Sequence, residues 1–162
     1  MSHQVMKLVL KIAVSAITIF YGLVPVLADL NETHLFNPLW SAHARLHGAW
    51  FLAFAAGIAL VGLFLVWVRD DVFLPITFGL MFVAGFWAAT IFAPVYGAAL
   101  VDENGYVQTI LGIESNMFLF SVVGVLLLAT LFFANRIYWK EQRMTAVPSP
   151  HYQWRSRSFG FL

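Results

Sequence analysis

The residue types with the greatest capacity for chemistry gather in one stretch of this sequence, residues 29–50. The stretch contains three of the five histidines, the carboxylates Asp29 and Glu32, one arginine and two tryptophans. Long apolar runs lie on both sides of it. We therefore look here first for acid–base chemistry, a ligand-binding pocket or a metal site.

Two histidines of the stretch, His43 and His47, lie four positions apart in the sequence, at i and i+4. This spacing lets two imidazoles on one helix reach a single metal ion. His34 could supply a third ligand, and Asp29, Glu32 or Glu114 a fourth. The same pair could instead hydrogen-bond carboxylates on other helices, or lie among the interfacial aromatic residues at the headgroup level. An acid–base pocket, a metal site and a structural network thus remain open.

Two carboxylates, Asp29 and Glu114, fall near the ends of apolar runs. An ionisable side chain in a membrane helix is costly and usually faces the bundle interior or water. Desolvation favours the protonated form of a carboxyl group, which suits a proton donor. We therefore predict a catalytic set of Asp29, His43, His47 and Glu114.

A face of the second apolar run carries aromatic residues beside the histidines. Residues 40, 43, 47, 50 and 54 follow helical 3, 4, 3, 4 spacing, so we expect this face to point into the bundle. Arg45 points about 200° away from His43 and could contact an anionic group or lipid phosphate. The predicted substrate-binding residues are Trp40, Arg45, Trp50, Phe54, Tyr96 and Asn116.

The elements that must position these residues are helices in a membrane. The 162-residue chain is 61% hydrophobic and 10% charged, whereas soluble domains have about 25% charged residues. Four apolar runs, near 12–30, 46–68, 72–100 and 109–135, are each long enough to span a bilayer. The sequence lacks cysteine, which excludes thiol chemistry, and its net charge of +1 provides no basic surface for nucleic acid.

Local signals predict where the helices begin and end. Asn37 followed by Pro38 is typical of a helix start, Asp71 can cap the third helix with Pro75 in its first turn, and Pro94 should kink that helix. In the first run, residues 15, 18, 22, 25 and 29 form a small and polar stripe typical of helix contacts in lipid. The alternative for this run is a signal peptide cleaved after Ala28.

Charge predicts the orientation. Eight basic residues fall on one side of the predicted spans and only Arg45 on the other, which places both termini in the cytoplasm. The expected fold is an all-α, antiparallel four-helix bundle in the cell inner membrane or an endomembrane. Residues 1–137 would form the transmembrane domain and residues 138–162 a cytoplasmic tail.

Pro25 and Asp29 close the first helix, and Pro38 follows soon after. In these residues the first part of the sequence resembles the emopamil-binding (EXPERA-type) family of sterol isomerases and lipid-ligand receptors. The resemblance covers about the first 40 residues and the helix count. It implies a membrane cavity for sterol-like molecules, with Asp29 as a cavity acid. The second helix departs from the family because it has no carboxylate and carries the two histidines instead.

The leading prediction is a membrane enzyme that isomerises, hydrates or cyclises a lipophilic small molecule or lipid at the outer end of the bundle. One alternative is a redox protein with a single metal ion bound by His34, His43 and His47. The other is a non-enzymatic membrane subunit. A homo-oligomer is compatible with each of these functions.

Overall fold

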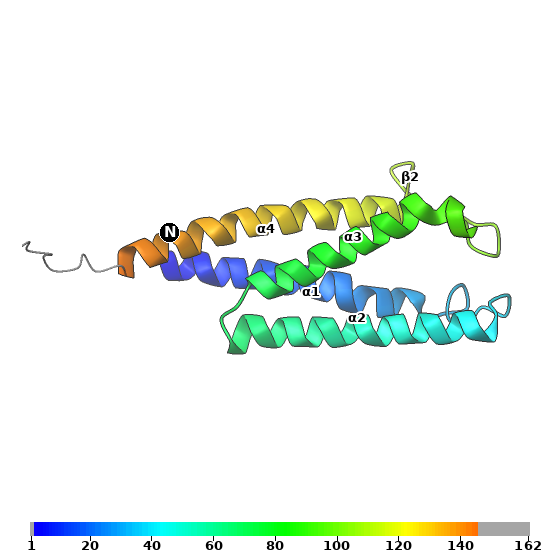
Figure 1. Ribbon diagram of the computed structural model, residues 1–162, viewed down its shortest axis with the longest axis horizontal. Coiled ribbons are helices and arrows are strands. Elements are labelled where there is room, and N and C mark those ends of the chain that lie inside the picture. Colours follow the sequence, from blue (N-terminus) through cyan, green and yellow to red (C-terminus); the bar gives the residue numbers. More distant parts are fainter. Residues whose placement is uncertain (1, 146–162) are drawn as a thin grey trace, which may run out of the picture.

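The described part of the chain forms four long helices and one small hairpin. The computed structural model describes residues 2–145, of which residues 140–145 are described only as helix. The elements are α1 (His3–Asp29), α2 (Ala42–Val68), α3 (Phe73–Tyr96), β1 (Thr109–Ile110), β2 (Ile113–Glu114) and α4 (Ser115–Thr145) (Figure 1). All four helices are long and apolar enough to cross a membrane, which confirms the prediction of four helical segments of spanning length.

The second helix begins later than predicted. α2 begins at Ala42, where the Ser41 hydroxyl accepts a hydrogen bond from the Ala44 amide at 3.1 Å. Asn37 is buried in the α1–α2 loop instead, because its side chain bonds the Thr33 carbonyl and the Leu39 amide. The prediction of a helix start at Asn37–Pro38 is therefore wrong: the asparagine stabilises a turn before the helix.

The third helix begins where the sequence predicted and ends earlier than the predicted run of residues 72–100. The Asp71 carboxylate accepts hydrogen bonds from the Phe73 and Leu74 amides, at 2.8 and 3.2 Å, and so satisfies two otherwise unpaired donors. The helix ends at Tyr96 because Gly97 adopts a left-handed conformation, with φ of 74°. Residues 97–100 therefore lie outside it.

The fourth helix also begins later than the apolar run suggests. Residues 109–114 form the hairpin, in which Thr109 pairs with Glu114 and Ile110 with Ile113. Leu111 and Gly112 both have positive φ, 53° and 79°, as a two-residue hairpin turn requires. α4 continues to Thr145, so residues 138–145 of the predicted tail are helical. Residues 146–162 lie outside the described residues.

Small residues bring α1 and α2 into close contact. A Cβ atom added to Gly22 would lie 2.5 Å from the Ala59 Cβ and 2.9 Å from the Ala55 carbonyl oxygen. Ser15, Thr18 and Gly22 are buried, which confirms that the small and polar stripe of α1 is a helix-contact face. Ser15 also accepts a hydrogen bond from the Trp67 indole at 2.9 Å.

An ion cluster joins three elements at one end of the molecule. The Asp70 carboxylate, in the α2–α3 turn, lies 3.0 Å from the Lys7 ammonium and 3.3 Å from that of Lys11. Partial desolvation raises the pKa of Asp70, but hydrogen bonds and charges from both lysines outweigh it, so the pKa lies below its ordinary value. The Tyr138 hydroxyl of α4 donates to the Asp70 carbonyl at 3.3 Å.

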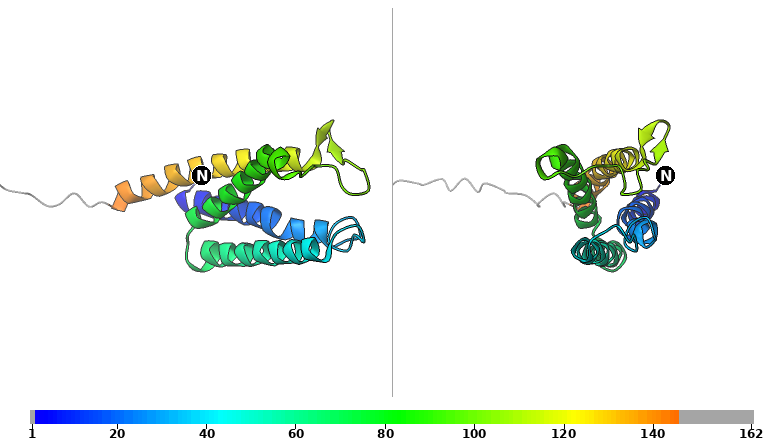
Figure 2. Two further views of the ribbon diagram at one scale, coloured as in Figure 1. Left: turned by 45° about the vertical axis from the view of Figure 1, so that its right-hand side comes forward. Right: turned by 90° about the vertical axis from the view of Figure 1, so that its right-hand side faces the viewer.

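The opposite end of the molecule is more open. The α1–α2 loop and the β1–β2 hairpin both lie there (Figure 1), and the end-on view shows how the four helices are arranged around one another (Figure 2). α3 starts beside the end of α2 and diverges from it toward this end. The half of the bundle near the Asp70 ion cluster is closely packed, and its core includes Val14, Val66, Ile76 and Leu127.

Candidate functional site

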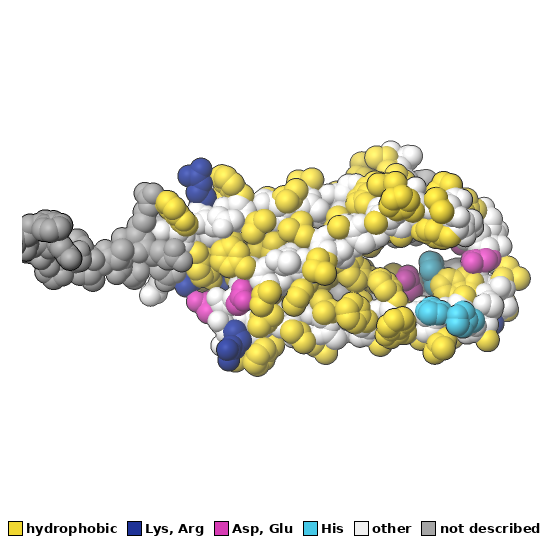
Figure 3. Space-filling view, viewed as in Figure 1, with side chains coloured by type: hydrophobic (Ala, Val, Ile, Leu, Met, Phe, Trp, Pro, Cys, Tyr) yellow, Lys and Arg dark blue, Asp and Glu magenta, His cyan; other side chains and the backbone are white. Residues whose placement is uncertain are grey.

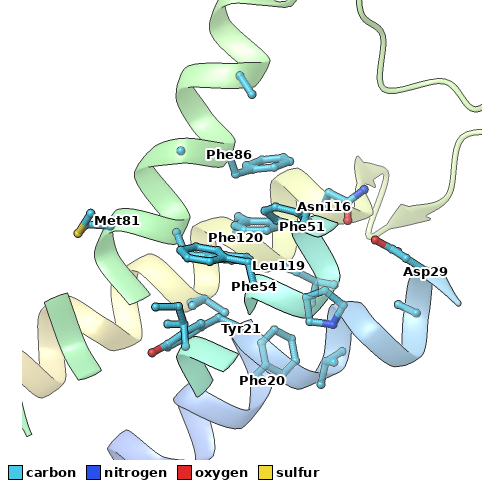
Figure 4. A pocket seen from close by; sticks show the side chains of 18 of the residues that line it. Phe20, Tyr21, Asp29, Phe51, Phe54, Met81, Phe86, Asn116, Leu119 and Phe120 are labelled. Carbon is cyan, nitrogen blue, oxygen red and sulfur yellow. The ribbon is translucent and has the colours of Figure 1, made fainter. Parts of the chain in front are cut away.

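A pocket of about 690 Å³ lies between the four helices in the open half of the bundle. Its volume and its largely apolar wall are typical of sites for small molecules. Figure 4 shows aromatic side chains from several helices pointing into it. The aromatic wall consists of Phe20, Tyr21, Phe51, Phe54, Phe78, Phe82, Phe86 and Phe120.

The pocket opens sideways between α2 and α3. Phe54, near the middle of α2, is 58% exposed, and Met81 of α3 is 67% exposed, although both line the pocket. Figure 3 shows the hollow between these two helices on the surface. Both helices are long and apolar enough to span a membrane, and the opening lies between their middle parts.

Polar side chains lie at the loop end of the pocket. Asp29 comes from the last residue of α1, His34 from the α1–α2 loop and Asn116 from the first turn of α4. Figure 4 shows Asp29 and Asn116 at the same end. The His34 Nε2 lies 4.0 Å from the Asp29 Oδ1, which is too far for a hydrogen bond. A ligand oxygen or nitrogen could lie about 2.8 Å from each atom and bond both.

The hydrogen bonds around His34 favour one neutral tautomer. The Thr33 hydroxyl donates its hydrogen to the Asn31 Oδ1 at 2.7 Å, and the same oxygen lies 2.9 Å from the His34 Nδ1. With the Thr33 hydrogen donated to Asn31, a neutral His34 ring carries its proton on Nδ1. In this tautomer the unprotonated Nε2 faces the Asp29 carboxylate, and the two acceptors can share one proton or bind one donor group.

Glu114, one of the four predicted catalytic residues, caps the start of α4 beside the pocket. Its two carboxylate oxygens accept hydrogen bonds from the Asn116 and Met117 amides and so cap α4. It also accepts from the Asn116 Nδ2 at 3.0 Å. This bond engages the side-chain NH₂ group of Asn116 and leaves its side-chain oxygen available as an acceptor. Glu114 therefore orients a pocket residue and does not itself line the pocket.

The predicted histidine pair lies on the outside of α2. His43 and His47 are exposed, and Trp50 of the same face is 67% exposed. Figure 3 shows histidine side chains on the surface at this end of the molecule. The prediction that this face points into the bundle is therefore wrong for His43, His47 and Trp50, whereas Phe54 of the same face lines the pocket. The contact face of α2 contains Gly48, Leu52, Ala55, Ala59 and Gly62, and includes the part-buried Arg45.

Three other predicted binding residues hold local structure. Arg45 donates to the Trp40 carbonyl at 3.1 Å and to the Pro38 carbonyl at 3.5 Å, so it fastens the loop to α2. The Trp40 ring packs on Gly48, where an added Cβ would lie 3.1 Å from it. Tyr96 is 59% exposed and its hydroxyl bonds the Ala89 carbonyl. Of the six predicted substrate-binding residues, Phe54 and Asn116 line the pocket.

The structure does not gather the three histidines of the predicted metal site. Within residues 2–145, no group of three His, Asp or Glu side chains is placed to hold one ion. His34 turns toward Asp29, while His43 and His47 pair with each other.

Sequence reasoning missed most of the pocket. It weighed His34 as a metal ligand only, and it assigned no role to the pocket-lining phenylalanines of α1, α3 and α4. A usable signal was present in the small residues of α2, because Gly48, Ala55, Ala59 and Gly62 recur at helical spacing and mark its contact face. That face would have turned His43 and His47 outward.

Comparison with known proteins places the chain in a family. Residues 11–127 match the family described as "Family of unknown function (DUF6640)", so the chain belongs to this family. No curated protein and no solved structure matches the chain. None of these comparisons connects it with the emopamil-binding family.

Proposed function

We propose that this member of the DUF6640 family binds a lipophilic molecule within the membrane and performs acid–base chemistry on its polar end. The observation that carries the proposal is the shape of the pocket. It opens between the middle parts of α2 and α3, two helices apolar enough to span a membrane, and ends at Asp29 and His34. A molecule that enters sideways from the bilayer would bring its polar group to these two side chains.

The facing acceptors of Asp29 and His34 suit proton transfer. Isomerisation, hydration and cyclisation of a lipophilic molecule each require a proton to be added at one atom and removed at another. With one shared proton, one side chain serves as the acid and the other as the base, at a separation of 4.0 Å. His34 thus takes the role first predicted for His43 and His47, while Asp29 keeps its own.

Asn116 and Phe54 would complete the binding site. The free amide oxygen of Asn116 can accept a hydrogen bond from a hydroxyl group of the ligand, and its orientation depends on Glu114. Phe54 would cover the apolar part of the ligand at the opening. Because the polar end of the pocket offers mainly hydrogen-bond acceptors, it favours a ligand whose polar group donates a hydrogen bond over one that carries a carboxylate or phosphate.

We further propose an antiparallel bundle with both termini in the cytoplasm of the cell inner membrane or in an endomembrane. Lys7, Lys11 and Asp70 meet at one end of the bundle, and Arg45 lies at the other. This distribution fits the positive-inside rule. Residues 1–137 would then be the transmembrane domain. Reporter fusions after residue 137 and in the 101–108 loop should report opposite sides, and equal signals would refute this topology.

The pocket can be tested by filling it. Gly85 lines the pocket, and an added Cβ there would meet no atom within 4 Å, so Gly85→Trp should fold and obstruct the opening. Gly57 on α2 also has open space and lies outside the pocket lining, so Gly57→Trp is a matched control. A long-chain alcohol bearing a photoreactive diazirine should label wild type and Gly57→Trp alike, and Gly85→Trp at least about fivefold less. Equal labelling of the three proteins would refute the pocket.

The chemical step needs a separate measurement. Asp29→Asn removes the acid–base group and keeps nearly the same shape, so the photoreactive alcohol should label this variant as it labels wild type. Lipid extracts of membranes containing the wild-type protein should show a chromatographic change that membranes containing Asp29→Asn lack. Identical extracts, with labelling intact, would leave the chain as a binding protein without the proposed chemistry.

A further inference from the structure

The exposed surface of α2 carries a second arrangement that the pocket does not use. The His43 and His47 Nε2 atoms lie 3.0 Å apart, on successive turns at the start of the helix. Their ring centroids are 4.5 Å apart at an interplanar angle of 77°. Both nitrogens thus lie within reach of one ion on the outside of the helix.

We propose that His43 and His47 together bind one divalent transition-metal ion, with Cu²⁺ as the preferred ion. Imidazole nitrogen is a common ligand for Cu²⁺, Ni²⁺ and Zn²⁺. The site lies outside the pocket lining and does not depend on the function proposed for the pocket.

The separation of the two nitrogens can be compared with the geometries of these ions. With metal–nitrogen bonds of about 2.05 Å, nitrogens 3.0 Å apart subtend an angle of about 94° at the metal. A tetrahedral ion would require nitrogens about 3.3 Å apart. An angle near 90° belongs to adjacent positions of a tetragonal or square-planar ion, which is the geometry of Cu²⁺ and Ni²⁺. Cu²⁺ also has the highest affinity of the divalent series for nitrogen ligands.

The surroundings leave space for the ion and its remaining ligands. Both histidines are exposed, and the Arg45 guanidinium is turned to the carbonyls of Trp40 and Pro38, so it does not occupy the site. No third His, Asp or Glu of the described chain joins the pair. Water would therefore complete the coordination, and the ion should exchange with solution.

In the absence of metal, the two rings share one hydrogen bond. Their separation of 3.0 Å is ordinary for such a bond, in which one Nε2 carries the hydrogen. Metal binding requires both Nε2 atoms to be unprotonated, so the donor ring moves its hydrogen to Nδ1. The two rings then turn so that both Nε2 lone pairs converge on the ion.

Purified full-length protein without a polyhistidine tag should be titrated with Cu²⁺. We expect one ion per chain and an electron paramagnetic resonance spectrum with coupling to two nitrogens. His43→Ala and His47→Ala should each lower the affinity at least about tenfold, because one imidazole loses the advantage of the second tethered ligand. The double variant should abolish the two-nitrogen signal.

Two controls separate this site from the pocket. His34→Ala and Asp29→Asn should bind Cu²⁺ as the wild type does, because neither residue belongs to the pair. Bound Cu²⁺ should also quench the fluorescence of Trp50, whose ring lies 6.0 Å from that of His47, and Trp50→Phe should reduce the quenching. Unchanged Cu²⁺ binding in the double variant, or no binding by the wild type, would overturn the proposal.

Discussion

The contact between α1 and α2 at Gly22 provides the sharpest test of the packing. In Gly22→Ala, the new methyl group would lie 2.5 Å from the Ala59 Cβ and 2.9 Å from the Ala55 carbonyl oxygen. Ordinary contacts of a Cβ atom are 3.4–4 Å. The methyl group faces a backbone atom and another short side chain, so neither can rotate away. The two helices must therefore separate.

The expected destabilisation follows from two opposing effects. Forcing an extra methyl group into a tight contact costs about 1–3 kcal/mol. Replacing glycine by alanine inside a helix returns up to about 1 kcal/mol. We therefore expect Gly22→Ala to lower the free energy of unfolding by about 1–2 kcal/mol. Gly57→Ala gains the same helix propensity, and its new methyl group would have no contact within 4 Å. It should therefore be neutral or stabilising by up to about 1 kcal/mol.

Unfolding in mixed micelles with increasing dodecyl sulfate, followed by circular dichroism, would measure both variants. A second substitution tests the cause. Ala59→Gly removes the atom that the new methyl group meets at 2.5 Å, so the double variant Gly22→Ala/Ala59→Gly should recover part of the loss. If Gly22→Ala were as stable as Gly57→Ala, α1 and α2 would not be in the close contact described.

Two further predictions concern the ends of the bundle. Because the folded-state pKa of Asp70 lies below its unfolded value, its stabilising effect should be present above the unfolded pKa of about 3.9 and lost as pH falls through the folded value. Asp70→Asn should therefore be less stable than wild type at neutral pH and equal to it in strong acid, as unfolding at several pH values would show. Cysteines introduced into this cysteine-free chain at His43 and His47 should react faster with a membrane-impermeant maleimide than one at Arg45, and the reverse order would mean that the histidine face points inward.

The amino-acid sequence by itself determined the number and the class of the elements. Four apolar runs predict four spans because the length and hydropathy of a span are local properties. The capping role of Asp71 was predictable for the same reason, since its carboxylate bonds amides two and three residues away. The buried stripe of α1 was predictable because glycine and hydroxyl residues stand out in an apolar helix.

Only the tertiary structure decided which side chains meet. α2 is apolar on all sides, so its spacing showed that His43, His47 and Trp50 share a face without showing where that face points. The direction depends on Gly22 of α1, which fits against Ala55 and Ala59 and turns the histidines outward.

Asp29 and Glu114 show the same dependence. Both were plausible pocket acids by position. The α1–α2 loop brings His34 to face Asp29, which no local pattern shows. Glu114 bonds amides two and three residues away, as Asp71 does, so its capping role is local, and only the lining of the pocket shows that it lies outside. A sequence pattern describes one helix or one turn at a time. The pocket is made by the separation of α2 from α3, which arises from contacts among all four helices.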